Sequence, residues 1–117
     1  MRIFLYGTLL DHHILARRSG RRGLERGALP AFLPGWRRVV LRQAPYPTLL
    51  RARRGGVPGL LVAPRGAVLR RLMAYEGAAY RLRSLRVLTR RGRCAAAAWI
   101  AAPTLAAHSR GWTPGWR

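Results

Sequence analysis

Acidic residues and cysteine are scarce in this chain of 117 residues, and lysine is missing. There are three acids, Asp11, Glu25 and Glu76, so any chemistry that needs a carboxylate must use one of them. Cys94 is the single cysteine, which excludes an internal disulfide and gives no sign of an oxidising compartment. The longest apolar stretch, 94–103, is about half as long as a membrane span requires. We therefore expect no contact with a membrane.

The composition predicts one globular domain over residues 1–117, because half of the residues are apolar and the length suits a single modest core. The apolar run near the N-terminus is short, ends at Asp11 and lacks a small-residue cleavage site. These features predict no signal peptide and a cytoplasmic location. The oligomeric state has no signature in the sequence.

Arginine is abundant and gives the chain a formal net charge of +20. Such an excess attracts phosphate polymers and favours salt-dependent, non-specific binding of nucleic acid. The arginines are nevertheless spread over every segment, which a drift in composition explains equally well. Trp112 and Trp116 are interleaved with Arg110 and Arg117 and could stack on bases, although a packed tail is the more common role of tryptophan.

The hydrophobic pattern predicts an α+β domain, with a small mixed or mostly antiparallel β-barrel-like sheet flanked by short helices. The expected strands are 1–6, 23–33, 36–43, 57–63, 80–87 and 93–102, and the expected helices are 12–18 and 66–75. Pro34 and Gly35 are expected to form a turn. Two prolines place 44–50 in an edge strand or a loop, and 110–117 is expected to be a loop or one helical turn.

Glu76 is the acid best suited to catalysis. It ends the predicted second helix, where a negative charge meets the unfavourable end of the helix dipole. The ordinary alternative is a solvated side chain paired with an arginine. Tyr75 and Tyr80 would give the carboxylate an apolar wall with two phenol donors, an environment that can raise its pKa towards working pH.

The other candidate groups have ordinary explanations. Asp11 is expected to cap the first helix, and Glu25, flanked by arginines, to form a surface ion pair. The His12–His13 pair suggests a metal, but the remaining histidine and the cysteine stand alone in the sequence. We therefore expect no metal site and no cofactor.

The first strand breaks at Gly7–Thr8, which exposes backbone N–H groups that have no partner in a sheet. Such a break suits either a turn or a cradle for an anion. No phosphate-binding loop, serine elbow or dinucleotide fingerprint is present. The break alone leaves both explanations open.

Four motifs occur in a fixed order: Tyr-Gly-Thr-Leu at 6–9, Tyr-Pro-Thr-Leu at 46–49, Val-Pro-Gly-Leu-Leu at 57–61 and Glu-Gly-Ala-Ala-Tyr at 76–80. In these motifs the chain resembles the gamma-glutamylcyclotransferase-like superfamily, in particular its AIG2-like and gamma-glutamylamine cyclotransferase branch. The resemblance spans nearly the whole chain. It departs from the family pattern at Leu82, where an arginine is frequent, and in lacking an acid shortly before Glu76.

The resemblance implies an enzyme that converts a gamma-glutamyl amine or amino acid to 5-oxoproline and releases the free amine. Glu76 would be its general acid and base. The implied substrate-binding residues are Tyr6, Gly7, Thr8, Leu9 and Tyr80, where backbone N–H groups of 7–9 would hold the substrate carboxylate. The alternatives are an inactive family member, which Leu82 favours, and an arginine-rich nucleic-acid-binding module on the same fold.

Overall fold

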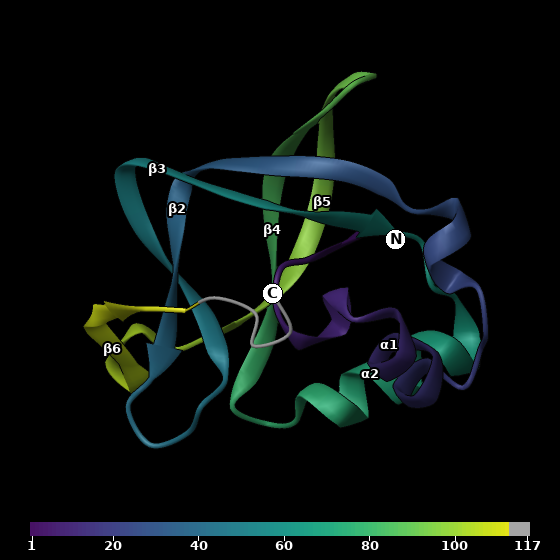
Figure 1. The fold of residues 1–117 in the computed structure, drawn as a ribbon, viewed down its shortest axis with the longest axis horizontal. Helices are drawn as coiled ribbons and strands as arrows, with labels where there is room; N and C mark the ends of the chain where they lie inside the picture. The colour runs from purple at the N-terminus through teal and green to yellow at the C-terminus, as the bar shows by residue number, and fades with distance from the viewer. Residues whose placement is uncertain (113–117) are drawn as a thin grey trace.

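The computed structural model describes residues 1–112, which form a sheet of six strands with helices at one end (Figure 1). The strands are β1 (Ile3–Leu5), β2 (Leu29–Leu41), β3 (Pro47–Val62), β4 (Tyr80–Thr89), β5 (Gly92–Ala101) and β6 (Ala106–Gly111). The helices are α1 (His12–Ser19) and α2 (Gly66–Glu76), and the short 3₁₀ turns are η1 (Thr8–Leu10), η2 (Leu24–Gly27) and η3 (Pro103–Leu105).

Five of the strands close into a barrel. Their order is β3-β1-β5-β4-β2, and β2 pairs again with β3, which removes the free edges of the sheet. β1 and β5 run parallel, and the other neighbours run antiparallel. β6 adds to β2 outside the closed set. The prediction of an α+β, barrel-like mixed sheet flanked by short helices is confirmed.

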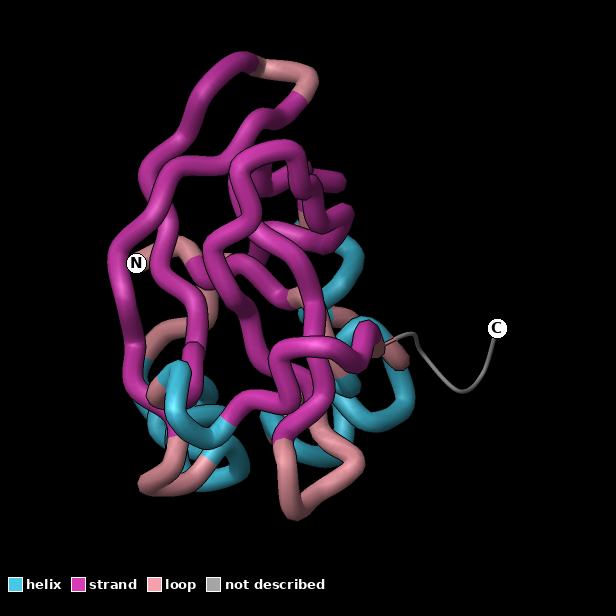
Figure 2. The backbone as a smooth tube through the Cα atoms, turned by 90° about the vertical axis from the view of Figure 1, so that its left-hand side faces the viewer, coloured by secondary structure: helices cyan, strands magenta, loops and turns pink. Residues whose placement is uncertain are grey.

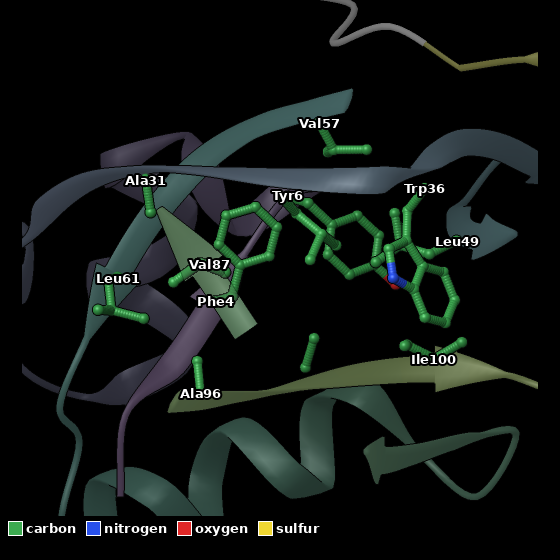
Figure 3. Close-up of a cluster of buried hydrophobic side chains, with 12 residues drawn as sticks. Phe4, Tyr6, Ala31, Trp36, Leu49, Val57, Leu61, Val87, Ala96 and Ile100 are labelled. Atoms are coloured by element: carbon green, nitrogen blue, oxygen red, sulfur yellow. The ribbon is translucent and has the colours of Figure 1, made fainter. Parts of the chain in front are cut away.

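The core has two large clusters, one on each face of the barrel wall, and a small third one made by Val39, Leu50 and Ala106. Inside the barrel, Phe4, Trp36 and Ile100 belong to a cluster of buried side chains (Figure 3). A second cluster fills the space between the barrel and the helices and includes Ile3 and Trp99. β1 is therefore buried on both faces, which explains why its sequence is apolar without alternation. Trp36 and Trp99 are both buried.

Both predicted helices are present. Asp11 caps α1, since its carboxylate accepts hydrogen bonds from the N–H groups of His13 at 2.9 Å and Ile14 at 3.3 Å. Donation from Ile14, and also from His13, lowers the pKa of Asp11. In α2 Leu72 is buried, whereas the next residue, Met73, is 46% exposed although its side chain is apolar. Tyr75 takes its place against the core.

The predicted turn at Pro34–Gly35 is wrong. β2 continues through these residues as one long strand, and its register with β3 shifts between Pro34 and Trp36. Gly35 has a φ of 83°, a conformation open to glycine that lets a strand accommodate an extra residue. The Pro-Gly pair, which is typical of a turn, therefore lies at a β-bulge within a continuous strand.

Three other boundaries differ from the prediction. β3 begins at Pro47, ten residues before the expected strand at 57, because a proline at the first position of a strand costs no interior hydrogen bond. Residues 24–27 form the turn η2 rather than the start of a strand. β6 extends to Gly111, into the segment expected to be a loop.

Of the two C-terminal tryptophans, the structure describes Trp112. The Trp112 indole N–H donates to the Pro45 carbonyl at 3.3 Å, and the Arg38 guanidinium lies 5.8 Å from the indole centre. This contact favours the packed tail over a free stacking surface at Trp112. Trp116 and Arg117 lie outside the described residues. Within residues 1–112, no helix has the length and apolar character needed to cross a membrane.

Candidate active site

A cavity of about 180 Å³ opens beside the end of β1, between the barrel and α2. Four parts of the chain, far apart in sequence, meet there. The lining residues are 4–9, Tyr46, Pro47, Tyr75, Glu76, Tyr80 and Trp99. The cavity thus contains every residue for which the sequence suggested a catalytic or substrate-binding role.

The floor of the cavity is the turn that follows β1. After Tyr6 the chain enters η1, whose first bond runs from the Leu10 N–H to the Gly7 carbonyl at 3.0 Å. The N–H groups of Gly7, Thr8 and Leu9 precede that bond, where a 3₁₀ helix provides no acceptor of its own. Three neighbouring residues with such N–H groups line a small cavity, an arrangement suited to an anion.

Glycine at position 7 lets β3 approach this turn. A Cβ atom there would lie 2.7 Å from Cγ of Pro47, closer than side chains pack. Pro47 also accepts a hydrogen bond from the Tyr80 hydroxyl at 2.7 Å. The first and second sequence motifs are therefore in direct contact, and the Tyr of the fourth motif joins them.

Glu76 occupies the C-terminal end of α2 and lines the cavity with its partly buried side chain. Burial raises the pKa of this carboxyl from its ordinary value of 4.5 to about 7. Among the described residues, no arginine lines the cavity despite the +20 charge of the chain. The carboxyl can therefore lose and regain a proton near neutral pH, as a general acid and base must.

The tyrosines shape the cavity through bonds to other groups. The Tyr75 hydroxyl bonds to Thr8 Oγ1 at 3.0 Å, and the Tyr6 hydroxyl donates to the Trp99 carbonyl. Burial raises the pKa of Tyr6 and of Tyr80 above the ordinary value. The Tyr80 hydroxyl donates to the Pro47 carbonyl rather than to Glu76, which contradicts the donor role expected for Tyr80. What remains of that expectation is the aromatic wall.

Sequence reasoning placed Tyr75 beside Glu76 but did not assign Tyr46 or Trp99 to the pocket lining. Tyr46 belongs to a motif that was recognised, so its signal was available. Trp99 has no local signal, since its place depends on the pairing of β5 with β1. Leu82, the departure from the family pattern, packs in the cluster between barrel and helices and does not line the cavity.

The remaining candidates lie outside the cavity. Glu25 is in η2, and its Oε2 is buried without a hydrogen-bond partner among residues 1–112, so that oxygen does not make the surface ion pair expected. The rings of His12 and His13 lie 4.2 Å apart. In the described part of the chain, no three histidine, cysteine or acidic side chains come together as metal ligands would.

A family model matches nearly the whole chain. The model described as gamma-glutamyl cyclotransferase, AIG2-like, matches residues 3–114. The chain belongs to this family. No curated protein sequence matches it.

Solved structures share the fold of this gamma-glutamyl cyclotransferase, AIG2-like chain. The solution structure of an Arabidopsis thaliana protein has a TM-score of 0.72 and 22% identity, covering 89% of this chain and 72% of that one. A structure described as a gamma-glutamyl cyclotransferase has a TM-score of 0.72 and 15% identity, with coverages of 87% and 66%. The crystal structure of an uncharacterized Homo sapiens protein has a TM-score of 0.68 and 18% identity, covering 86% of this chain and 66% of that one. The chain is thus shorter than all three.

Proposed function

We propose that this chain converts a gamma-glutamyl amine or amino acid to 5-oxoproline and the free amine, with Glu76 as general acid and base. One observation carries the proposal. Glu76, whose pKa burial raises to about 7, lines the same small cavity as Gly7, Thr8 and Leu9, whose N–H groups precede the first hydrogen bond of η1. Membership of the gamma-glutamyl cyclotransferase, AIG2-like family supports this reaction class.

The turn at 7–9 binds the glutamyl part of the substrate in this proposal. Its N–H groups donate to the α-carboxylate, which fixes one end of the flexible glutamyl chain. The aromatic wall made by Tyr6, Tyr75 and Tyr80 confines the rest. Because the reaction is intramolecular, holding the chain in its folded conformer removes much of the barrier.

Glu76 moves the proton that the cyclisation requires. The ionised carboxylate takes a proton from the substrate α-ammonium, and the freed amine attacks the γ-carbonyl carbon. A new C–N bond closes the five-membered ring. Glu76 then gives the proton to the nitrogen of the original amide, whose C–N bond breaks as the amine leaves. The second proton of the attacking nitrogen passes to the released amine, which departs as its ammonium ion and leaves the ring nitrogen with one N–H. The enzyme ends the cycle in its starting protonation state, and each step uses groups of the chain and the substrate alone.

The assay measures 5-oxoproline and free amine released from a panel of gamma-glutamyl amines and gamma-glutamyl amino acids. We expect both products in equal amounts from at least one substrate class. The matched control is the same substrate with its α-amine acetylated, which cannot cyclise. Release of glutamate instead of 5-oxoproline would indicate attack by water, and no product from any substrate would favour an inactive family member.

The pH dependence of the reaction follows from the raised pKa of Glu76. As a base the carboxyl must start ionised, so kcat/KM is expected to rise with pH through about 7 and then level off. A carboxyl of ordinary pKa 4.5 would instead give a rate that is already constant at pH 6. Initial rates across that range, at substrate concentrations well below KM, distinguish the two profiles.

A further inference from the structure

A row of outward-facing side chains crosses four strands of the barrel near the tip of the β4–β5 hairpin. Phe32 of β2 lies opposite Pro58 of β3 on one side and Leu88 of β4 on the other, and Leu88 lies opposite Arg93 of β5. We call Pro58, Phe32, Leu88 and Arg93 the outer row. Its members share a face because directly paired residues point to the same side of a sheet.

The outer row is apolar at its centre and open to solvent. The neighbours of Phe32 in β2, Ala31 and Leu33, point into the barrel and are buried, whereas Phe32 is 43% exposed and Leu88 is 41% exposed. A Cβ atom added at Gly56 would lie 2.0 Å from Cζ of Phe32. The ring therefore lies against the backbone of the neighbouring strand, fixed along the sheet surface.

The surroundings of the outer row carry positive charge. Arg86 is exposed and lies two residues before Leu88 in β4, so it shares the face of the row, as does exposed Arg93. The three acids of the chain are all elsewhere: in the cap of α1, in η2 and at the end of α2. The helices and the β4–β5 tip lie at opposite ends of the molecule (Figures 1 and 2).

We propose that the outer row is a binding surface for single-stranded nucleic acid. An exposed aromatic ring fixed on a sheet can stack on an unpaired base, and Arg86 and Arg93, on the Leu88 side of the ring, can contact the neighbouring phosphates. A duplex keeps its bases paired and stacked, so it offers the ring no partner. A second copy of this chain is disfavoured, because it would bring two +20 surfaces together.

The stacking role of Phe32 is tested with a fluorescent single-stranded oligonucleotide of about 12 nucleotides, using anisotropy at several salt concentrations. Phe32→Leu keeps an apolar cover over Gly56 but removes the ring, and we expect it to weaken binding by about 5- to 100-fold. Phe32→Tyr keeps the ring and is expected to bind as the wild type does. Thermal unfolding checks that both variants fold. Equal binding by Phe32→Leu and the wild type overturns the proposal.

The position of the charge is tested with two matched double variants. Arg86→Gln with Arg93→Gln removes two charges beside the outer row, and Arg22→Gln with Arg70→Gln removes two exposed charges at the helix end. The first pair is expected to make the negative slope of log binding constant against log salt concentration shallower by about 1.4, and the second to leave that slope unchanged.

Three results would contradict the outer-row site. Equal losses in the two double variants would show that net charge alone binds the oligonucleotide. Tighter binding of the same sequence as a duplex would exclude stacking on Phe32. Binding to phosphatidylserine vesicles, sensitive to Phe32→Leu and without binding of the oligonucleotide, would assign the surface to a membrane instead.

Discussion

Replacing Glu76 by glutamine is expected to lower the rate of 5-oxoproline formation by about 10²- to 10⁴-fold. The amide has nearly the same shape as the carboxyl, so the cavity and the turn at 7–9 keep their geometry. It cannot take a proton from the substrate ammonium or return one to the leaving nitrogen. We therefore expect the loss in kcat, with little change in KM. Initial rates of 5-oxoproline release over a range of substrate concentrations measure both constants.

The matched control is Glu25→Gln, the same chemical change at an acid in η2, outside the cavity. It removes one negative charge from the chain just as Glu76→Gln does, so the two variants have equal net charge. We expect Glu25→Gln to retain the wild-type rate. Equal rates for Glu76→Gln and the wild type would remove Glu76 from the mechanism, whereas equal losses in both variants would point to net charge.

The Glu76→Gln replacement is also expected to stabilise the fold, relative to the wild type, at alkaline pH. Burial raises the pKa of Glu76 from 4.5 to about 7, so the folded protein binds the proton more tightly than the unfolded chain does. This contribution to the free energy of unfolding is fully present below about pH 4.5 and is lost as the pH rises through about 7. The loss amounts to at most about 3 kcal/mol, because each pKa unit corresponds to about 1.4 kcal/mol.

Urea denaturation at about pH 5 and about pH 8 measures this effect, with the free energy of unfolding taken from the midpoint and slope. The wild type is expected to lose stability relative to Glu76→Gln between the two pH values. Other titrating groups are common to both proteins, so the difference between the two curves isolates Glu76. A constant difference across the range would mean that the carboxyl titrates alike in the folded and unfolded states.

The expected loss of activity and the expected gain in stability of Glu76→Gln have the same physical origin. The cavity holds an acid in surroundings that disfavour its charge, which lowers stability at the pH where the reaction needs the ionised form. A carboxylate on the surface, next to one of the many arginines, would be more stable and a weaker base. In the proposed mechanism, the lack of an arginine among the described residues of the cavity lining keeps the pKa of Glu76 high enough for it to act as a base.

Local patterns in the sequence predicted those elements whose signals are local. Asp11 as a cap, the helix expected at 66–75 and the strands expected at 80–87 and 93–102 depend on residues within a few positions of one another. The predictions were wrong where the local conformation depends on pairing with a strand that is distant in the sequence. Pro34–Gly35 is typical of a turn in isolation, and only the continuous pairing of β2 with β3 makes it a bulge. Pro47 similarly begins a strand because β2 is there to pair with it.

The sequence by itself determined that a carboxylate mechanism must choose among three acids, that the chain turns after Tyr6, and that Glu76 ends a helix. Tertiary structure alone decided that Glu76 and the N–H groups of 7–9 meet in one cavity, and that the neighbouring phenols bond elsewhere. The physical reason is that closing the barrel joins β1 to both β3 and β5. These strand pairings join residues that are far apart in the sequence, so no local sequence pattern predicts them.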